Sequence, residues 1–413
     1  MPSYSTRVHK ARTMTLTLLI DLDDTLLTND IKAFQKVYFK CLAEALRPWV
    51  PVETMMSAMM AAVQAMLVKM TPALTMEEQF DAVFYPKIGV AKTELTEVIN
   101  KFYAETFPEL RKYTAPKPEA VDLVHQAIKR GWDVVVATNP LFPFTAIEQR
   151  LEWAGLPAKE TSFKWITSYE TSHFSKPHPA YYAEILGQLN WPSTPAVMIG
   201  NSLEDDILPA ERLGLPTYWL HERELDTSAR HPLSATGDLG SVLLWLENIE
   251  REQPAIDFQN ETAIFATLQS TPGVLENMSQ SLTPAIWVQR PAESEWNIIE
   301  ILAHLRDVDR EVNFGRVQQT IRGENPFLPA ANTDPWVQER NYAGEPGPSA
   351  LAGFIHSRTT LLNLLDGATP TDLSQPARHA IFGPTTLKEL LGFIATHDRT
   401  HIRQAWNAIH NGR

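Results

Sequence analysis

Short apolar runs alternate with longer stretches of helical spacing between residues 14 and 248 of the chain. In the longer stretches, such as Ala120–Lys129, apolar residues recur every three or four positions, which is typical of an amphipathic helix. The short runs have the length of strands that are buried on both faces. They are Leu16–Leu22, Asp133–Thr138, Phe163–Thr167, Ala196–Gly200 and Pro216–Leu220. The alternation predicts an α/β domain with a doubly wound parallel sheet over residues 14–248.

The gap between the first two predicted strands is too long for a single crossover helix. Residues from about 30 to 113 are rich in helix formers, notably in Lys40–Leu46, Met55–Met70 and Leu95–Phe107. We therefore expect a helical cap, inserted into the α/β domain at about residues 30–113.

The pattern changes after residue 248. Residues 249–261 are polar and lose the periodicity, so we interpret them as a linker. Over residues 262–413 we find no segment with the pattern of a strand, but four helical segments separated by loops rich in Pro and Gly. These segments are Ala263–Leu282, Glu295–Arg322, Ser349–Leu365 and Leu387–His410. Four helices of this size predict a four-helix bundle.

Length and charge narrow the class of protein. A chain of 413 residues exceeds the size at which one core stops growing, so two domains are expected. The net charge of −13 argues against a nucleic-acid backbone as the partner, because binding it requires a basic face.

Residues 1–13 are basic without an apolar segment and are expected to form a flexible tail. No apolar run is long enough to span a membrane. A single cysteine suits a reducing compartment, so we expect a cytoplasmic protein.

Acidic residues end the first predicted strand abruptly. Asp21 and Asp23 are two positions apart, so on an extended chain their side chains point the same way. Two converging carboxylates repel unless a cation lies between them or one holds a proton. The pair predicts either a Mg²⁺ site or a nucleophile beside an acid/base group. The alternative interpretation is an acidic loop that caps a following helix.

Three further signals lie at or beyond the ends of later predicted strands. Thr138 and Asn139 offer a hydroxyl and backbone donors for a phosphate oxygen. Lys176 lies on a loop that prolines stiffen. Asp205 and Asp206 form a second acidic cluster, although the same residues could simply begin a helix.

In their order and spacing these signals resemble the haloacid dehalogenase superfamily, and the likeness covers about residues 14–248. The resemblance implies that Asp21 attacks phosphorus to form an aspartyl-phosphate. It further implies that Asp23 protonates the leaving oxygen and then activates water. The phosphoryl group would be bound by Thr25, Thr138, Asn139 and Lys176. A Mg²⁺ ion would be bound by Asp21, Asp23, Asn201, Asp205 and Asp206.

One position departs from that family's pattern. Phosphatases of this type usually have Gly-Asp where this chain has Gly200-Asn201. Asparagine still offers a carbonyl oxygen without the negative charge, so we expect weaker Mg²⁺ binding rather than none. The departure also keeps a halide-cleaving reaction open, because dehalogenases of the superfamily work without Mg²⁺. They generally lack the second acid, however, and the presence of Asp23 favours a phosphatase.

Histidines occupy the apolar face of the last predicted helix. His397 and His401 are four positions apart, so their rings lie on one side of the helix at a distance that suits a shared metal ion. His304 on the second predicted helix is a third candidate. Three neutral imidazoles would leave the metal one open coordination position, as in catalytic zinc sites. The alternative is ordinary histidines that are hydrogen-bonded in the core or face solvent.

The segments Glu295–Leu305 and His397–His401 resemble the two signatures of the DinB-like four-helix family, over about residues 263–410. The resemblance implies that His304, His397 and His401 hold Zn²⁺ or Ni²⁺. Some members of that family transfer low-molecular-weight thiols or act as metal-dependent hydrolases. Three acids near these histidines are candidates for orienting the rings: Asp307, Asp309 and Asp398.

Together these features predict a Mg²⁺-dependent phosphatase of a small phosphorylated metabolite, fused to a metal-binding bundle. A first alternative places the main activity, a metal-dependent thiol transfer or hydrolysis, in the bundle. A second is a degenerate phosphatase whose bundle serves as an interaction module, for example in a homodimer.

Overall fold

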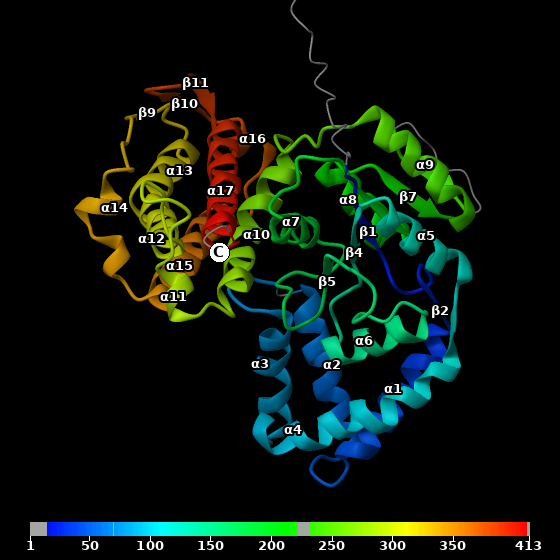
Figure 1. Ribbon diagram of the computed structural model, residues 1–413. Helices are drawn as coiled ribbons and strands as arrows, with labels where there is room; N and C mark the ends of the chain where they lie inside the picture. The colour runs from blue at the N-terminus through cyan, green and yellow to red at the C-terminus, as the bar shows by residue number, and fades with distance from the viewer. Residues whose placement is uncertain (1–14, 69, 222–230, 411–413) are drawn as a thin grey trace, which may run out of the picture.

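A parallel six-stranded sheet forms the centre of the N-terminal half (Figure 1). The computed structural model describes residues 15–68, 70–221 and 231–410, so the predicted tail at residues 1–13 lies outside the described residues. The strand order is β5-β4-β1-β6-β7-β8. The strands are β1 (Thr17–Ile20), β4 (Asp133–Val136), β5 (Trp165–Ile166), β6 (Ala196–Gly200), β7 (Thr217–Leu220) and β8 (Ala235–Gly237). The predicted parallel α/β fold is therefore confirmed.

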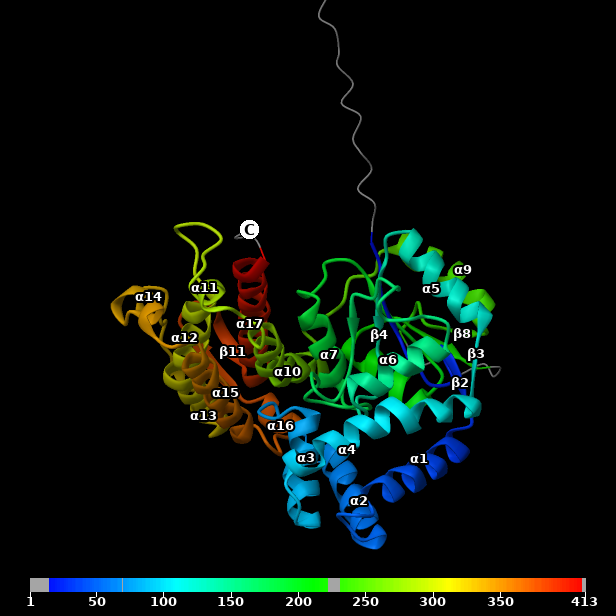
Figure 2. The same ribbon diagram turned by 60° about the horizontal axis from the view of Figure 1, so that its bottom comes forward.

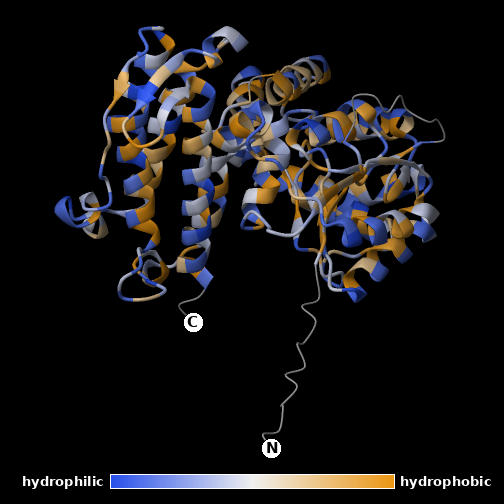
Figure 3. Ribbon diagram, turned by 90° about the horizontal axis from the view of Figure 1, so that it is seen from above, coloured by the Kyte–Doolittle hydropathy of each residue, from blue (hydrophilic) through white to orange (hydrophobic). Residues whose placement is uncertain are grey.

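The strand β1 lies in the middle of the sheet and is buried on both faces. Leu18 is in register with Val134 of β4 and with Val197 of β6. Leu18 and Ile20 belong to one apolar core, whereas Leu19 belongs to another on the opposite face. This explains the continuous apolar run, because alternating polar residues would be buried against helices. Figure 3 shows the strands of the sheet among the hydrophobic segments.

Helices cover both faces of the sheet. The helices α5 and α9 contact each other on one side, and α7 and α8 contact each other on the other side. Their bounds are α5 (Pro118–Lys129), α6 (Phe144–Trp153), α7 (Pro179–Gln188), α8 (Leu208–Leu213) and α9 (Leu239–Glu252), with a π-helical turn η3 (Leu203–Ile207) before α8. The predicted strands are all present, β6 with the predicted bounds and the others shorter. The strand β8 was not predicted, because its sequence Ala-Thr-Gly contains no apolar run.

The helical cap is inserted between β1 and β4 and lies below the sheet in Figures 1 and 2. It consists of α1 (Ile31–Leu46), α2 (Val52–Val68), α3 (Met76–Ile88) and α4 (Lys92–Lys101), followed by η1 (Phe102–Thr106) and η2 (Phe107–Tyr113). The chain enters and leaves the cap through an antiparallel pair, β2 (Leu27–Asn29) and β3 (Thr114–Pro116). This pair holds the two ends of the insertion together.

The C-terminal half is helical (Figure 1). Its long elements are α10 (Glu261–Ser279), α12 (Ile298–Val308), η4 (Asp309–Asn313), α13 (Phe314–Ile321), α15 (Gly347–Leu364) and α17 (Leu387–His410). Because α12, η4 and α13 follow one another without a break, they make up the second predicted helix. Short elements connect them: α11 (Pro284–Trp287), α14 (Trp336–Glu339), η5 (Tyr342–Gly344) and α16 (Pro370–Leu373).

The prediction that this half contains no strand is wrong. Three short strands form a second sheet in the order β11-β10-β9, namely β9 (Phe327–Leu328), β10 (Pro376–His379) and β11 (Gly383–Thr386). Strands of two to four residues are too short to show an alternating pattern. Prolines at positions 376 and 384 also argue against strands, although β10 and β11 form a hairpin there. Among the described residues, no helix combines the length and the hydrophobicity that a membrane crossing requires.

Candidate functional site

The carboxyl end of β1 carries Asp21, and Lys176 from a distant loop reaches it. Asp21 continues the strand, because its backbone N–H donates to the carbonyl of Ile199 at 3.0 Å. The Nζ atom of Lys176 lies 2.7 Å from Asp21 Oδ1 and 2.6 Å from Asp206 Oδ1. All three side chains are buried. The structure thus joins the first motif, the lysine and the second acidic cluster around one ammonium.

The charges of this cluster do not balance. Burial alone would lower the pKa of Lys176, but the carboxylates of Asp206 and Asp21 hold that pKa well above its ordinary value. Burial raises the pKa of Asp206, although the Lys176 ammonium opposes this shift. Two carboxylates on one buried ammonium favour a second cation at this point.

The second carboxylate of the first motif pairs with a different cation. Asp23 Oδ1 contacts the guanidinium of Arg150 and accepts a hydrogen bond from the side-chain amide of Asn29. Arg150 was not among the residues predicted from the sequence. Its signal is its place on the buried face of α6, beside Ile147 and Leu151, because a buried arginine requires an anionic partner.

Asn201 lies next to the first motif. Thr25 Oγ1 donates to Asn201 Oδ1 at 3.4 Å, and Trp219 Nε1 donates to the backbone carbonyl of Asn201 at 2.9 Å. The amide oxygen of Asn201 therefore faces the hydroxyl of Thr25 at the carboxyl edge of the sheet, where the residue stands in place of the usual aspartate.

Asp205 and Asp206, which follow Asn201, point in different directions. Asp206 Oδ2 accepts from the backbone N–H of Ser202 at 3.0 Å, while its Oδ1 contacts Lys176. A Cβ atom at position 200 would lie 2.3 Å from Asp206 Oδ2, so the glycine permits this approach. Asp205 accepts from Ser202 Oγ at 3.3 Å. The structure thus directs Asp206 to the lysine and Asp205 to the start of the following turn.

Thr138 and Asn139 follow the neighbouring strand β4. The backbone carbonyl of Thr138 accepts hydrogen bonds from Thr167 Oγ1 and from the Tyr181 hydroxyl, both at 2.8 Å. Asn139 Oδ1 is buried and has no hydrogen-bond partner among the described residues. A buried acceptor without a partner is costly, so this oxygen is available to a ligand.

The ligand atoms at this edge of the sheet suit a hard cation. They are the carboxylate oxygens of Asp21 and Asp206, which contact Lys176, and the amide oxygen of Asn201, which contacts Thr25. Mg²⁺ prefers oxygen ligands, and the excess negative charge of the pair favours a divalent ion. The residues present therefore fit Mg²⁺.

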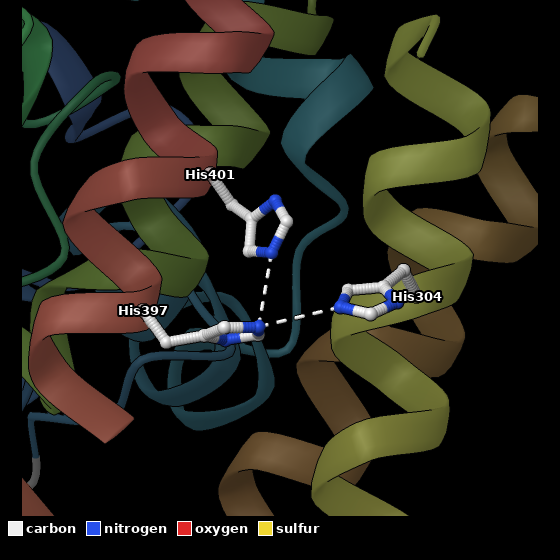
Figure 4. A group of neighbouring side chains, drawn as sticks. All are labelled: His304, His397 and His401. Atoms are coloured by element: carbon white, nitrogen blue, oxygen red, sulfur yellow. Dashed lines mark hydrogen bonds between the residues drawn. The ribbon is translucent and has the colours of Figure 1, made fainter. Parts of the chain in front are cut away.

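A second candidate site lies inside the bundle. His304 on α12 and His397 and His401 on α17 turn their rings toward one point (Figure 4). His397 Nε2 lies 3.3 Å from His304 Nε2 and 3.0 Å from His401 Nε2. Burial lowers the pKa of His304 to about 3 and that of His401 to about 4, and it holds that of His397 well below its ordinary value. Three neutral imidazoles that converge in this way fit a transition-metal ion.

The three acids considered for orienting the rings have other partners. Asp398 and Asp309 both pair with the buried Arg358, through Asp398 Oδ1 at 2.8 Å and Asp309 Oδ2 at 2.7 Å. Asp307 contacts Arg306 at 2.7 Å, and also Arg340 and Tyr342. The Nδ1 atoms of His304 and His401 have no hydrogen-bond partner among the described residues. The acids form ion pairs between helices and are not carboxylate partners of the rings.

The two halves of the chain meet at α7 and α10 (Figure 1). The two helices approach closely at their glycines, which leave no room for a side chain. An added Cβ atom at Gly187 would lie 2.5 Å from Val274, and one at Gly273 would lie 2.4 Å from His173 Nδ1. His173 Nδ1 lies 2.7 Å from Glu184 Oε1 of α7, and His173 Nε2 lies 2.8 Å from Glu276 Oε2 of α10. His173 precedes Lys176 by three residues, so the bundle contacts the loop that carries the lysine.

Comparison with known proteins supports two separate assignments. Residues 15–214 match the model of the haloacid dehalogenase-like hydrolases. Residues 267–405 match the model of the DinB superfamily. No curated protein matches the chain.

Several solved structures are similar to parts of the chain. A 2-haloacid dehalogenase from Pseudomonas syringae pv. Tomato is 21% identical with a TM-score of 0.40, and the match covers 57% of this chain and 99% of that one. A phosphatase of the haloacid dehalogenase type from Thermococcus onnurineus is 15% identical with a TM-score of 0.37, over 56% of this chain and 98% of that one. YfiT from Bacillus subtilis, described as an unusual four-helix bundle, is 17% identical with a TM-score of 0.34, over 37% of this chain and 88% of that one.

The two family matches agree with the two sites, since the first covers Asp21, Lys176 and Asp206 and the second covers the three histidines. The chain joins a haloacid dehalogenase-like hydrolase domain to a domain of the DinB superfamily.

Proposed function

We propose that the hydrolase domain is a Mg²⁺-dependent phosphatase of a small phosphate ester. The observation that carries the proposal is the contact of Lys176 Nζ with both Asp21 and Asp206 at the carboxyl edge of the sheet. A carboxylate nucleophile and a phosphate monoester repel each other, so positive charge must lie beside both. When bound at the oxygens of Asp21, Asp206 and Asn201, Mg²⁺ supplies part of that charge.

The reaction proceeds in two steps at this chain's own residues. A carboxylate oxygen of Asp21 attacks phosphorus, the ester P–O bond breaks, and Asp23 gives its proton to the leaving oxygen. Water then attacks the phosphorus of the aspartyl-phosphate and gives a proton to Asp23. The P–O bond to Asp21 breaks, which releases inorganic phosphate and restores the Asp21 carboxylate. Lys176 holds the phosphoryl oxygens, and the half-buried Asn139 lies shortly after the end of β4. Arg150 contacts Asp23 and holds its carboxyl group in place.

The test uses p-nitrophenyl phosphate with and without Mg²⁺. We expect hydrolysis that requires Mg²⁺ and that vanishes in Asp21→Asn. The matched control is Asp133→Asn, which makes the same charge change at the opposite end of the sheet, where β4 begins. Complete inactivity of the folded wild-type protein at saturating Mg²⁺ would contradict the proposal. It would favour a degenerate phosphatase in which Asn201 has abolished metal binding.

A second function is favoured by the three converging histidines. We propose that they hold a Zn²⁺ or Ni²⁺ ion, whose open position would bind and acidify a water molecule or a thiol. A cavity of about 250 Å³ reaches His397 and is lined on one side by Phe382 and Phe393. This cavity gives a small substrate access to the site.

Metal analysis tests the second proposal without any assumption about the reaction. We expect about one equivalent of transition metal in the wild type and a loss of it in His397→Ala. His356→Ala is the control, because His356 is an exposed histidine of the same bundle, on α15. An unchanged metal content in His397→Ala would remove the site.

A further inference from the structure

The helical cap encloses a cavity of about 600 Å³. Its lining comes from all four long cap helices, from η1, and from residues 141–143, 145 and 169–170 of the α/β domain. This volume is typical of a site for a small organic molecule. The cavity is separate from the Lys176 cluster and from the histidines, and nothing described so far uses it.

Aromatic rings dominate the lining. Eight of the described side chains around the cavity are Phe or Tyr, and they come from α1, α3, η1 and the α/β domain. The rings of Phe80 and Phe84 stack with their centroids 4.9 Å apart, and the ring centroids of Tyr38 and Phe142 are 5.3 Å apart. Such faces attract apolar groups, and their negative quadrupoles also attract organic cations.

The charged groups at the cavity carry excess negative charge. Among the described lining residues, the acids are Glu77, Asp81 and Glu170, and the base is Lys92. Lys92 Nζ lies 2.6 Å from Glu77 Oε1 and 2.6 Å from Asp81 Oδ2, so two carboxylates share one ammonium. Glu170 accepts from the backbone N–H of Phe144 at 2.9 and 3.0 Å. An anionic ligand would be repelled here, whereas a cation would complete the pairing of the acids.

Burial makes this excess charge costly. It raises the pKa of Asp81, against the nearby Lys92 ammonium, and it likewise raises the pKa of Glu170. A ligand that brings positive charge would relieve that cost. Aromatic faces and surplus carboxylates thus point to the same class of ligand.

We propose that the cap cavity is a binding site for a small organic ammonium ion with an aromatic or branched aliphatic body. The apolar body packs among the rings, and the ammonium lies at the Glu77 and Asp81 carboxylates. One wall is Phe142, whose ring lies 5.5 Å from the guanidinium of Arg150, the partner of Asp23. The Phe142 wall thus connects the cavity to Asp23 through Arg150.

The test is a calorimetric titration of the full chain without Mg²⁺ and without phosphate, so it is independent of hydrolysis. The probes share one body and differ in charge: 3-phenylpropylammonium, 3-phenylpropan-1-ol and 3-phenylpropionate. We expect the ammonium probe to bind at least about tenfold more tightly than the carboxylate probe, with the alcohol between them. Equal affinities for the two charged probes, or no binding of the ammonium probe at millimolar concentration, would overturn the proposal.

Three variants locate the site. Asp81→Asn should weaken binding of the ammonium probe about tenfold and leave the affinity for the alcohol unchanged. Ala104→Trp, which places a bulky ring on the cavity wall, should weaken all three probes. Glu97→Gln removes a carboxylate from an exposed position of the same helix as Lys92 and should change nothing. If Glu97→Gln weakens binding as much as Asp81→Asn does, the preference reflects the net charge of the chain and the proposal fails.

Discussion

Glu276 of the bundle and His173 of the hydrolase domain form an ion pair across the boundary between the two domains, with Glu276 Oε2 2.8 Å from His173 Nε2. The other ring nitrogen lies 2.7 Å from Glu184. The bundle makes a second contact with the same loop, in which Asn277 Nδ2 donates a hydrogen bond to the carbonyl of Thr171 at 2.6 Å. The bundle thus constrains the loop that places Lys176 beside Asp21.

We predict that this ion pair makes stability depend on pH. Burial alone would lower the pKa of His173, but Glu184 and Glu276 raise it to about 10. An unfolded histidine titrates near 6.5, so the imidazolium stabilises the fold fully below about pH 6.5 and loses this effect as the pH rises through about 10. Glu276→Gln should lower the free energy of unfolding by about 1–3 kcal/mol at pH 6.5 and less at pH 10.

Denaturant unfolding at the two pH values measures this difference. Glu293→Gln serves as the control, because it removes the charge of an exposed acid elsewhere in the bundle. A loss of stability in Glu276→Gln that is the same at both pH values would show that His173 is neutral in the native protein.

The glycines of α7 and α10 should resist substitution. Gly273→Ala would place a Cβ atom 2.4 Å from His173, and Gly187→Ala would place one 2.5 Å from Val274. We expect each change to destabilise the protein by about 1–3 kcal/mol, because the two helices must separate. Gly315→Ala, where a Cβ meets nothing within 4 Å, should be neutral or stabilising by up to about 1 kcal/mol. Thermal unfolding of the three variants decides this comparison.

Removal of Lys176 should couple stability to Mg²⁺. In Lys176→Met the buried carboxylates of Asp21 and Asp206 lose their shared ammonium and repel each other. We expect phosphatase turnover to fall about 10²–10³-fold, and Mg²⁺ to raise the unfolding temperature of the variant more than that of the wild type. Lys159→Met, at a side chain 85% exposed, is the control. If Mg²⁺ shifts both variants equally, the ion does not bind at the lysine cluster.

Arg358 should be the most sensitive charged residue of the bundle. It is fully buried between Asp309 and Asp398, so Arg358→Met leaves two buried carboxylates without a counter-charge. We expect a loss of about 3–5 kcal/mol in the free energy of unfolding. The triple variant Arg358→Met/Asp309→Leu/Asp398→Leu should recover most of it, because an apolar replacement carries no unpaired charge. Failure of the triple variant to recover would assign the three residues a role other than charge balance.

Much of the fold follows from local pattern. The apolar run at Leu16–Leu22 predicts β1 because a strand buried on both faces permits no alternation, and the histidines at 397 and 401 share a face because the helix repeats every 3.6 residues. The strands β9, β10 and β11 did not follow, since β9 pairs with the distant β10 and the β10–β11 hairpin is short and contains prolines.

The remaining differences concern three-dimensional contacts. The sequence alone could not distinguish Asp205 from Asp206, because the turn after β6 decides which carboxylate reaches Lys176. The acids near the histidines were candidates for orienting the rings because they are close to them along the chain. Two of them, Asp309 and Asp398, instead form ion pairs with Arg358 on a separate helix. The helix α10 is rich in small residues, including Ser270, Thr271 and Gly273, and this is the signal of a helix buried on more than one side.

The position of α10 has a practical consequence for dissecting the protein. A fragment that ends in the linker would lack α10, so the face of α7 around Gly187, which packs against Val274, would be exposed to water. Such a fragment would be prone to aggregation, and its inactivity would be misleading. An expression boundary after Ser279 keeps the shared helix with the hydrolase half, at the cost of a bundle that can no longer assemble.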